Sequence, residues 1–263
     1  MTTMPKKTLK LDGAKNYLMA IEGVLVSDNQ IVRGADRFIR RLYQKGLKFL
    51  LLTNNSRRTP YETADVLQKL GLAVLAENVF SSSLATARYL HSQKPGGTAF
   101  VIGERGLLSA LEEVGYQISD QNPDYVVLGG SNRHSFEDIS RAVNLIRQGA
   151  KFICTNPDRA GHSQGKVAPA TGAMAALVEA ASGIAPFFIG KPNPFMIRSA
   201  LNYLGVHSED TIMLGDNMET DIIAGLESGM QTILVLSGET QLEDLPHYAY
   251  QPTFVIRSVA DLK

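Results

Sequence analysis

The sequence predicts an α/β fold in which crossover helices connect the strands of a parallel sheet. Short apolar runs, rich in Leu or β-branched residues, alternate with amphipathic stretches along nearly the whole chain. This alternation is typical of repeated strand–helix–strand units. Several runs are apolar on both faces, as central strands of a parallel sheet are. At 263 residues and 44% hydrophobic residues, the chain can form one large domain or a domain that carries an insertion.

Eight apolar runs are expected to form the strands of this fold. Each is short and is bounded by polar or turn-forming residues, which favours a strand over a buried helix. The runs are 17–26, 48–53, 99–103, 125–130, 151–155, 187–190, 211–215 and 232–236.

Two of the helices between these runs have recognisable N-terminal and C-terminal capping signals. Thr59 is expected to cap a helix that starts at a proline, and Glu62 completes a capping box with it. Gly71 ends that helix about three turns later. Ser135 opens a second helix, which Gly149 ends.

The domain organisation is expected to be a core domain with an insertion, because no Pro- or Gly-rich linker separates two halves of the chain. Serine-containing segments at 81–83 and 182–186 are the candidate joints. We therefore expect a core domain at 14–81 and 186–263, and an inserted α/β domain at 82–185.

Composition excludes several classes of partner. The 26 Lys and Arg residues balance 26 Asp and Glu residues, so the chain has no basic field for nucleic acid or an anionic membrane.

Cys154 is the single cysteine and lies in an apolar run, so we expect a small buried side chain and no intramolecular disulfide. No segment reaches the ~18 apolar residues of a membrane span, and no secretory signal is recognisable. We expect a soluble cytoplasmic protein.

Polar side chains follow four of the apolar runs. In an open parallel α/β sheet, ligands bind at the carboxyl ends of the strands. The four segments together supply a hydroxyl, amides, a lysine and carboxylates, which suit a phosphate group and a hard cation such as Mg²⁺. They lie at 20–25, 53–56, 190–192 and 215–221.

Five phrases in this order carry a resemblance to a known family. They are Gly23-Val24-Leu25, the run 50–56, the Thr-Asn-Pro-Asp phrase at 155–158, Gly190-Lys191-Pro192 and the run 215–221. The set resembles the haloacid dehalogenase-like (HAD) phosphatase superfamily, and within it the NagD-like, class IIA subfamily. The resemblance extends from Tyr17 to about Ser258. It implies a Rossmann-like HAD core with a parallel sheet and an inserted α/β cap.

The resemblance also implies an activity, which is Mg²⁺-dependent hydrolysis of small phosphomonoesters such as sugar phosphates, nucleotides or p-nitrophenyl phosphate. In the family, the first strand ends in Asp-x-Asp-Gly, where the first Asp attacks phosphorus and the second protonates the leaving group. Thr53, Asn54 and the adjacent Asn55 correspond to residues that bind the phosphoryl group. Lys191 matches the lysine that offsets the negative charge of nucleophile and phosphate.

The metal ligands and the cap loop are implied in the same way. Asp216 matches the main Mg²⁺ ligand, with Asn217 and Asp221 around it and the backbone carbonyl of Glu22 as a further ligand. In the cap, Asn156, Asp158 and Arg159 match the loop that selects the substrate. A small phosphorylated metabolite is therefore the implied partner, and the resemblance also admits a homo-oligomer.

At the centre of the implied mechanism the sequence departs from the family. The nucleophile position holds Ala20, which has no nucleophile and cannot ligate a metal, and the acid/base position holds Glu22. Loss of the attacking side chain costs covalent enzymes on the order of a million-fold in turnover. Glu22 is chemically able to act as a base on water. Its extra methylene, however, shifts the carboxylate by roughly one bond length, in a setting where about 1 Å matters.

Two functions therefore stay open at the level of sequence. The first is a phosphatase-family hydrolase whose activity Ala20 abolishes or strongly reduces. The second is a non-catalytic phosphometabolite-binding or regulatory protein that keeps Thr53, Asn54 and Lys191 as an anion site. The sequence does not separate natural divergence at position 20 from removal of an aspartate that was once there.

Overall fold

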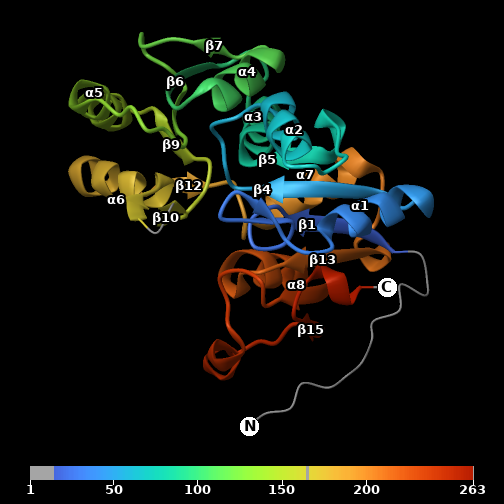
Figure 1. Cartoon of the computed structure of the whole chain (residues 1–263). Coiled ribbons are helices and arrows are strands. Elements are labelled where there is room, and N and C mark those ends of the chain that lie inside the picture. Colours follow the sequence, from blue (N-terminus) through green and yellow to red (C-terminus); the bar gives the residue numbers. More distant parts are fainter. Residues whose placement is uncertain (1–14, 164–165, 263) are drawn as a thin grey trace. The chain divides into compact units, whose positions relative to one another are not determined.

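The computed structural model describes residues 15–163 and 166–262, and the chain divides into two compact units (Figure 1). Unit 1 contains the residues up to Leu51, Val66–Val74 and the residues from Leu204 onward, and unit 2 contains Leu52–Asp65 and Leu75–Tyr203. The expected boundaries of core and cap stay a prediction. At the first expected joint there is no linker, because β5 ends at Ser81 and α3 begins at Ser82.

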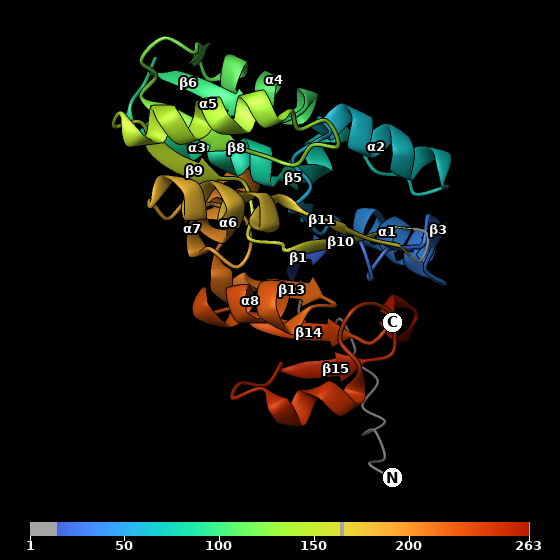
Figure 2. The ribbon, with the colours of Figure 1, turned by 90° about the vertical axis from the view of Figure 1, so that its left-hand side faces the viewer.

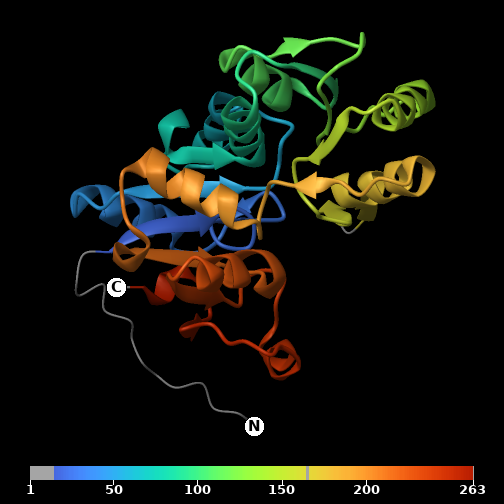
Figure 3. The same ribbon diagram turned by 180° about the vertical axis from the view of Figure 1, so that it is seen from behind.

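The larger sheet confirms the expected α/β fold. It has six strands in the order β15-β14-β13-β1-β4-β5. β1 pairs with β13, β13 with β14 and β14 with β15, all in parallel, and Figure 3 shows β1 and β13 side by side. The strands are β1 (Asn16–Ala20), β4 (Phe49–Thr53), β5 (Val79–Ser81), β13 (Thr211–Gly215), β14 (Gln231–Val235) and β15 (Phe254–Ile256).

Unit 1 builds its core from both faces of its strands. Leu18, Met213 and Ile233 are fully buried on three neighbouring strands, and the ring of Tyr17 packs edge-on against Phe38 of α1, with 5.5 Å between ring centroids. The other elements with residues in this unit are β2 (Val26–Ser27), β3 (Gln30–Ile31), α1 (Ala35–Gln44), α2 (Pro60–Lys69), α8 (Ile223–Glu227), the π-helix η3 (Met218–Ile222), and the 3₁₀ turns η2 (Ser208–Asp210), η4 (Leu242–His247) and η5 (Val259–Asp261).

Unit 2 contains a second parallel sheet, with five strands in the order β12-β9-β8-β6-β7. Helices α5 and α6 lie side by side over one face of this sheet and enclose an apolar core with it (Figure 2). The strands and these helices are β6 (Thr98–Ile102), β7 (Gln117–Ile118), β8 (Tyr125–Leu128), β9 (Lys151–Cys154), β12 (Phe187–Phe188), α5 (Phe136–Arg147) and α6 (Thr171–Ser182).

The remaining elements of unit 2 are helices and an antiparallel hairpin. They are η1 (Ala76–Asn78), α3 (Ser82–Gln93), α4 (Arg105–Glu113), α7 (Pro194–Leu204) and the hairpin of β10 (Ala160–Ser163) and β11 (Lys166–Pro169). Cys154 is fully buried in the core of this unit, as expected, and burial raises the pKa of its thiol. None of the described helices combines the length and the apolar character that crossing a membrane requires.

Each of the eight expected runs overlaps a strand. The run 17–26 is divided, because the chain turns after Ala20: the N–H groups of Leu25 and Val26 both donate to the carbonyl of Ile21, at 2.9 and 3.1 Å. The β10–β11 hairpin was not expected from the sequence. Its strands have only four residues each, AGHS and KVAP, which is too short for the apolar periodicity that identifies a half-buried strand.

The expected helix caps are confirmed. The backbone N–H of Thr59 donates to Glu62 Oε2 at 2.9 Å, and the N–H of Glu62 donates to Thr59 Oγ1 at 3.2 Å. Ser135 caps α5 by accepting a hydrogen bond from the N–H of Asp138 at 2.9 Å. Gly71 and Gly149, beyond the helix ends, have φ values of 103° and 114°, which favour glycine.

The Thr59 cap gives a test of this local structure. Thr59→Ala removes the acceptor for the Glu62 N–H, so we expect the free energy of unfolding to fall by about 1 kcal/mol. Thr59→Ser keeps the hydroxyl and should change it much less. Chemical denaturation of the three proteins measures the difference, and equal stabilities for the alanine and serine variants would contradict the cap.

Candidate active site

The predicted site residues form two groups, one in each compact unit, and each group lies at the carboxyl ends of parallel strands. The Asp216 group, in unit 1, comprises Ala20, Glu22, Asp216, Asn217 and Asp221. The Lys191 group, in unit 2, comprises Thr53, Asn54, Asn55, Asn156, Asp158, Arg159 and Lys191.

Asp216 directly follows β13 and is held by backbone on two sides. Its side chain is buried, and Oδ2 accepts a hydrogen bond from the N–H of Glu239 at 2.9 Å. A Cβ atom at Gly23 or at Gly238 would lie only 2.1 Å from Oδ2. Both positions therefore require glycine for the carboxylate to stand where it does.

Asp221 holds the chain that presents Asp216. Its side chain is buried, and Oδ2 accepts hydrogen bonds from the N–H groups of Asp216 and Asn217, at 3.2 and 3.3 Å. Asn217 in turn caps the following π-helix, with Oδ1 accepting the N–H of Glu219 at 2.8 Å. Single π-helical turns of this kind are frequent at functional sites.

Positions 20 and 22 differ in their environment. Ala20 is the last residue of β1 and is buried, and its methyl group offers no donor or acceptor. Glu22 is exposed and begins a tight turn, in which the N–H of Gly23 donates to the carbonyl of Val26 at 2.8 Å. The end of β1, the strand that neighbours β13, therefore carries no carboxylate at position 20.

The donor set of the Asp216 group fits Mg²⁺ in type but is small. The part of the chain that the structure describes holds no cluster of three or more His, Cys, Asp or Glu side chains that could bind a metal. Mg²⁺, however, commonly binds through one or two carboxylates together with substrate phosphate and water. Asp216 and Asp221 with the backbone carbonyl of Glu22 supply oxygen donors of that kind.

Lys191 and the residues that follow β9 lie at the carboxyl edge of the five-stranded sheet, while Thr53, Asn54 and Asn55 belong to the end of β4 and the loop after it. Thr155 follows β9, and its N–H donates to the carbonyl of Leu128 on β8 at 2.9 Å. Gly190 follows β12, and its N–H donates to the carbonyl of Thr155 at 2.8 Å. Three neighbouring strands thus bring the segments that follow them together, with Lys191 next to Thr155 and Asn156.

Asn54 binds the backbone of Lys191 at two points. Its Oδ1 accepts the N–H of Lys191 at 2.9 Å, and its Nδ2 donates to the carbonyl of the same residue at 3.0 Å. The second Nδ2 hydrogen goes to Asp158 Oδ1, also at 3.0 Å. Asn54 is buried, and so is Lys191. The Asn54 amide therefore fixes Lys191 and the cap-loop residue Asp158 relative to each other.

A second set of buried hydrogen bonds fixes Asn54 itself. Asn156 Nδ2 donates to the carbonyl of Asn54 at 2.8 Å, and Asn156 Oδ1 accepts the N–H of Asp158 at 3.2 Å. Ser56 Oγ accepts hydrogen bonds from Thr155 Oγ1 at 3.1 Å and from a backbone N–H at 2.8 Å. These contacts pair buried polar groups that would otherwise be costly.

The other members of the Lys191 group are more exposed. Thr53, the last residue of β4, is half-buried, and its Oγ1 accepts the N–H of Asn55 at 3.0 Å. Asn55 is exposed and closes a turn by accepting the N–H of Arg57 at 3.0 Å. Arg159 is also exposed at the start of the β10–β11 hairpin.

Sequence reasoning missed several residues that position these groups. Ser56 and Thr155 lie inside phrases that it quoted, but their burial depends on contacts across 99 positions of sequence. Ser237, Gly238 and Glu239 follow the run 232–236, so the rule about polar residues at strand ends could have found them. Ser237 Oγ donates to the carbonyl of Gly23 at 2.6 Å.

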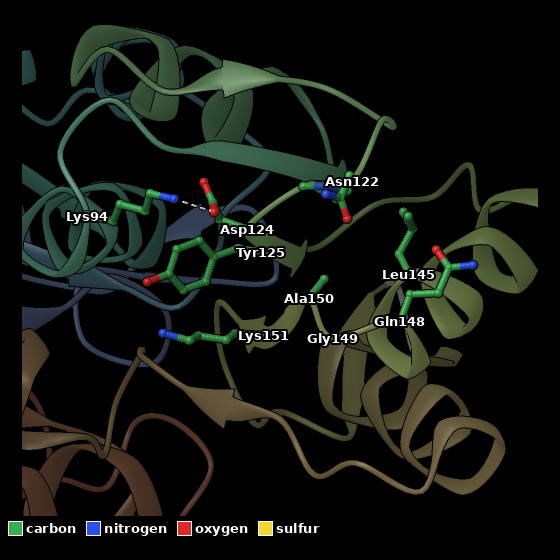
Figure 4. A pocket seen from close by; sticks show the side chains of 10 residues that line it. Lys94, Asn122, Asp124, Tyr125, Leu145, Gln148, Gly149, Ala150 and Lys151 are labelled. Carbon is green, nitrogen blue, oxygen red and sulfur yellow. Dashed lines mark hydrogen bonds and ion pairs between the residues drawn. The ribbon is translucent and has the colours of Figure 1, made fainter.

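A separate pocket in unit 2 is lined by none of the predicted site residues (Figure 4). It has a volume of about 320 Å³ and lies at the amino ends of β8 and β9, the sheet edge opposite the Lys191 group. Lys94 Nζ lies 2.5 Å from Asp124 Oδ1, and this hydrogen bond, with that from the Thr98 N–H, lowers the pKa of Asp124. Lys151 Nζ lies 5.6 Å from the centroid of the Tyr125 ring.

Comparison with known families agrees with this arrangement. Residues 17–117 match the family described as Haloacid dehalogenase-like hydrolase, and residues 188–262 match the family described as HAD-hydrolase-like. The two matched segments contain β1, β4 and β13, whose carboxyl ends carry Ala20, Thr53 and Asp216.

Individual relatives are similar over nearly the full length. The chain is 48% identical to the dihydroxyacetone phosphatase of Corynebacterium glutamicum, over 94% of this chain and 90% of the relative. It is 40% identical to the ribonucleotide monophosphatase NagD of Escherichia coli K12, over 94% and 98%. The solved structure of NagD from Escherichia coli K-12 superimposes with a TM-score of 0.90, covering 95% of this chain and 99% of that one. The chain therefore belongs to the haloacid dehalogenase-like hydrolases, and within them to the NagD-like, class IIA subfamily.

The Asn54 contacts can be tested through stability. Asn54→Ala leaves the buried N–H and carbonyl of Lys191 without their side-chain partner, so we expect the free energy of unfolding to fall by about 2–3 kcal/mol. Asn55→Ala is the matched control, since Asn55 is exposed and makes a local turn contact. Urea denaturation measures both variants, and a similar small loss in the two would contradict a positioning role for Asn54.

Proposed function

We propose that this chain carries the site of a Mg²⁺-dependent phosphomonoester hydrolase and that Ala20 abolishes or strongly reduces its turnover. The observation that supports this most directly is that β1 ends in alanine, while the Lys191 amine and the Asp216 and Asp221 carboxylates are present and buried. The residues that bind a phosphate and a cation are thus present without the one that would attack phosphorus.

The Lys191 group is proposed to bind the phosphate. A buried lysine whose backbone is fixed by Asn54 places a positive charge with little conformational freedom, which favours a small dianion. The hydroxyl of Thr53 and the amides around it add hydrogen-bond donors. Because both Nδ2 hydrogens of Asn54 are engaged, we assign Asn54 the role of positioning Lys191 and Asp158.

The covalent route needs a carboxylate at position 20. In that route a carboxylate oxygen attacks phosphorus, the bond from phosphorus to the ester oxygen breaks, and a neighbouring acid protonates the departing oxygen. Ala20 has no atom for the first step. Glu22 is left as a base that can take a proton from water, and the direct attack of water should be slow.

Mg²⁺ is the proposed cofactor, because the family is typically Mg²⁺-dependent and the oxygen donors of the Asp216 group suit it. Asp216 would be its main protein ligand, with the backbone carbonyl of Glu22, while Asn217 and Asp221 orient the loop. When bound, the cation would neutralise charge on the phosphoryl oxygens. Without a carboxylate at position 20, we expect its affinity to be lower than with one.

The proposed substrates are small phosphorylated metabolites. The relatives named above act on dihydroxyacetone phosphate and on ribonucleotide monophosphates, as their names say. We propose that residues 82–185 form the cap and that Asn156, Asp158 and Arg159 select the ligand. Arg159 is exposed, so it is available for a second anionic group of the ligand.

A non-catalytic binding function is the second candidate, and the same alanine favours it. A chain that keeps a buried Lys191 and its hydrogen-bond network can bind a phosphometabolite without converting it. Both candidates predict that phosphate raises the melting temperature, because a ligand that binds the native state stabilises it. Measurement of substrate turnover distinguishes the hydrolase from the binding protein.

The decisive experiment restores the missing carboxylate. Ala20→Asp should raise p-nitrophenyl phosphate hydrolysis in excess Mg²⁺ by up to about 10⁶-fold over the unchanged chain, the factor that loss of an attacking side chain costs. Ala20→Asn is the matched control, because its side chain has the same shape and cannot form a phosphoryl intermediate.

The other results of this experiment are also informative. Similar rates for the unchanged chain and both variants would show that position 20 is not the nucleophile position. If none of the three proteins hydrolyses p-nitrophenyl phosphate while phosphate still raises the melting temperature, the binding function is favoured.

A further inference from the structure

Three neighbouring strands of unit 1 surround Asp216 with the loops at their carboxyl ends. β13 lies between β14 and β1, and the pairings on both sides are parallel. The loop after β1 contains Gly23, the loop after β13 contains Asp216, and the loop after β14 contains Ser237, Gly238 and Glu239. The central carboxylate is therefore flanked by one loop on each side.

The loop after β14 contacts Asp216 and also the loop on the far side of it. The N–H of Glu239 donates to Asp216 Oδ2 at 2.9 Å, and the N–H of Thr240 donates to the Asp216 carbonyl at 3.1 Å. Ser237 Oγ donates to the carbonyl of Gly23 at 2.6 Å. This last hydrogen bond joins the two flanking loops, with the Asp216 carboxylate between them.

Glycine is required at position 238 for a steric reason and not for its backbone conformation. Its φ lies outside the left-handed region, so other residue types can adopt its backbone conformation. The three atoms nearest to a Cβ at position 238 all belong to the Asp216 side chain, at 2.1–2.6 Å. Gly23 has the same close approach, but its φ of +70° demands glycine in any case.

The arrangement fixes the orientation of the carboxylate before any cation arrives. A ligand side chain that is already held by hydrogen bonds and packing loses less conformational entropy on binding a metal, and such supporting contacts change metal affinity by about 10–100-fold. The effect should matter more in this chain than in one with a carboxylate at position 20, because Asp216 has fewer partners to share the cation with.

We propose that the segment Ser237-Gly238-Glu239 is a positioning element that holds the Asp216 carboxylate for Mg²⁺. Glu239 contributes its backbone N–H, Gly238 contributes the space that the carboxylate occupies, and Ser237 fixes the distance to the opposite loop. This inference rests on the proposed function, since it assumes that Asp216 binds the cation.

The test is Mg²⁺ titration calorimetry on the full chain and three variants. Gly238→Ala places a methyl group where the carboxylate stands and should weaken Mg²⁺ binding about tenfold or more. Ser237→Ala removes the link between the loops and should weaken it by a smaller factor, and Ser237→Thr should restore it. Gly161→Ala is the matched control, because a Cβ there meets no atom within 4 Å, and it should leave the affinity unchanged.

A second measurement separates positioning from a general defect. Affinity for inorganic phosphate without Mg²⁺ should be the same in Gly238→Ala as in the unchanged chain, whereas a misfolded variant would lose both ligands. If Gly238→Ala does not fold, Ser237→Ala against Ser237→Thr decides the question.

The outcomes distinguish the two levels of the proposal. Mg²⁺ binding by the unchanged chain with equal affinity in Gly238→Ala and Ser237→Ala would overturn the positioning role alone. Absence of Mg²⁺ binding in the unchanged chain and in Gly161→Ala would overturn the proposed metal site, and the positioning role with it.

Discussion

The parallel pairing of strands is the constraint on which both groups of polar residues depend. Because neighbouring strands run in the same direction, the residues that follow them collect at one edge of the sheet. In unit 1 this places Gly23, Asp216 and Ser237 on adjacent loops, and in unit 2 it places Thr155 beside Gly190. Antiparallel strands would send alternate loops to opposite edges and disperse the same side chains.

At such an edge, backbone groups that have left the sheet still need hydrogen-bond partners. Side chains meet that need here and acquire fixed positions in doing so. Asn54 pairs with the backbone of Lys191 much as a neighbouring strand would, and Asp221 accepts two N–H groups from the loop that carries Asp216. Stability and preorganisation of the site therefore come from the same contacts, and a change that disturbs one should disturb the other.

Ala20 contributes no charge at this edge of the six-stranded sheet. A carboxylate at position 20 would place a negative charge at the end of β1, the strand next to β13, which Asp216 follows. The backbone nevertheless packs closely around Asp216, because Gly23 and Gly238 lie so near its carboxylate that neither position has space for a Cβ atom. The Asp216 carboxylate is thus closely held on two sides, whereas the neighbouring strand β1 ends in a methyl group.

The sequence by itself determined the α/β class, the positions of eight strands, the caps at Thr59 and Ser135 and the family, because these depend on local periodicity, on capping chemistry and on short phrases in a fixed order. It also led to the hypothesis that Ala20 stands at the nucleophile position of the family, which stays a prediction. Only the tertiary structure showed that the side-chain amide of Asn54 forms hydrogen bonds with Lys191 and Asp158. It also showed that the absence of a Cβ at Gly238 leaves space for the Asp216 carboxylate. Those contacts join residues more than 20 positions apart, so their partners exist only once the strands have paired.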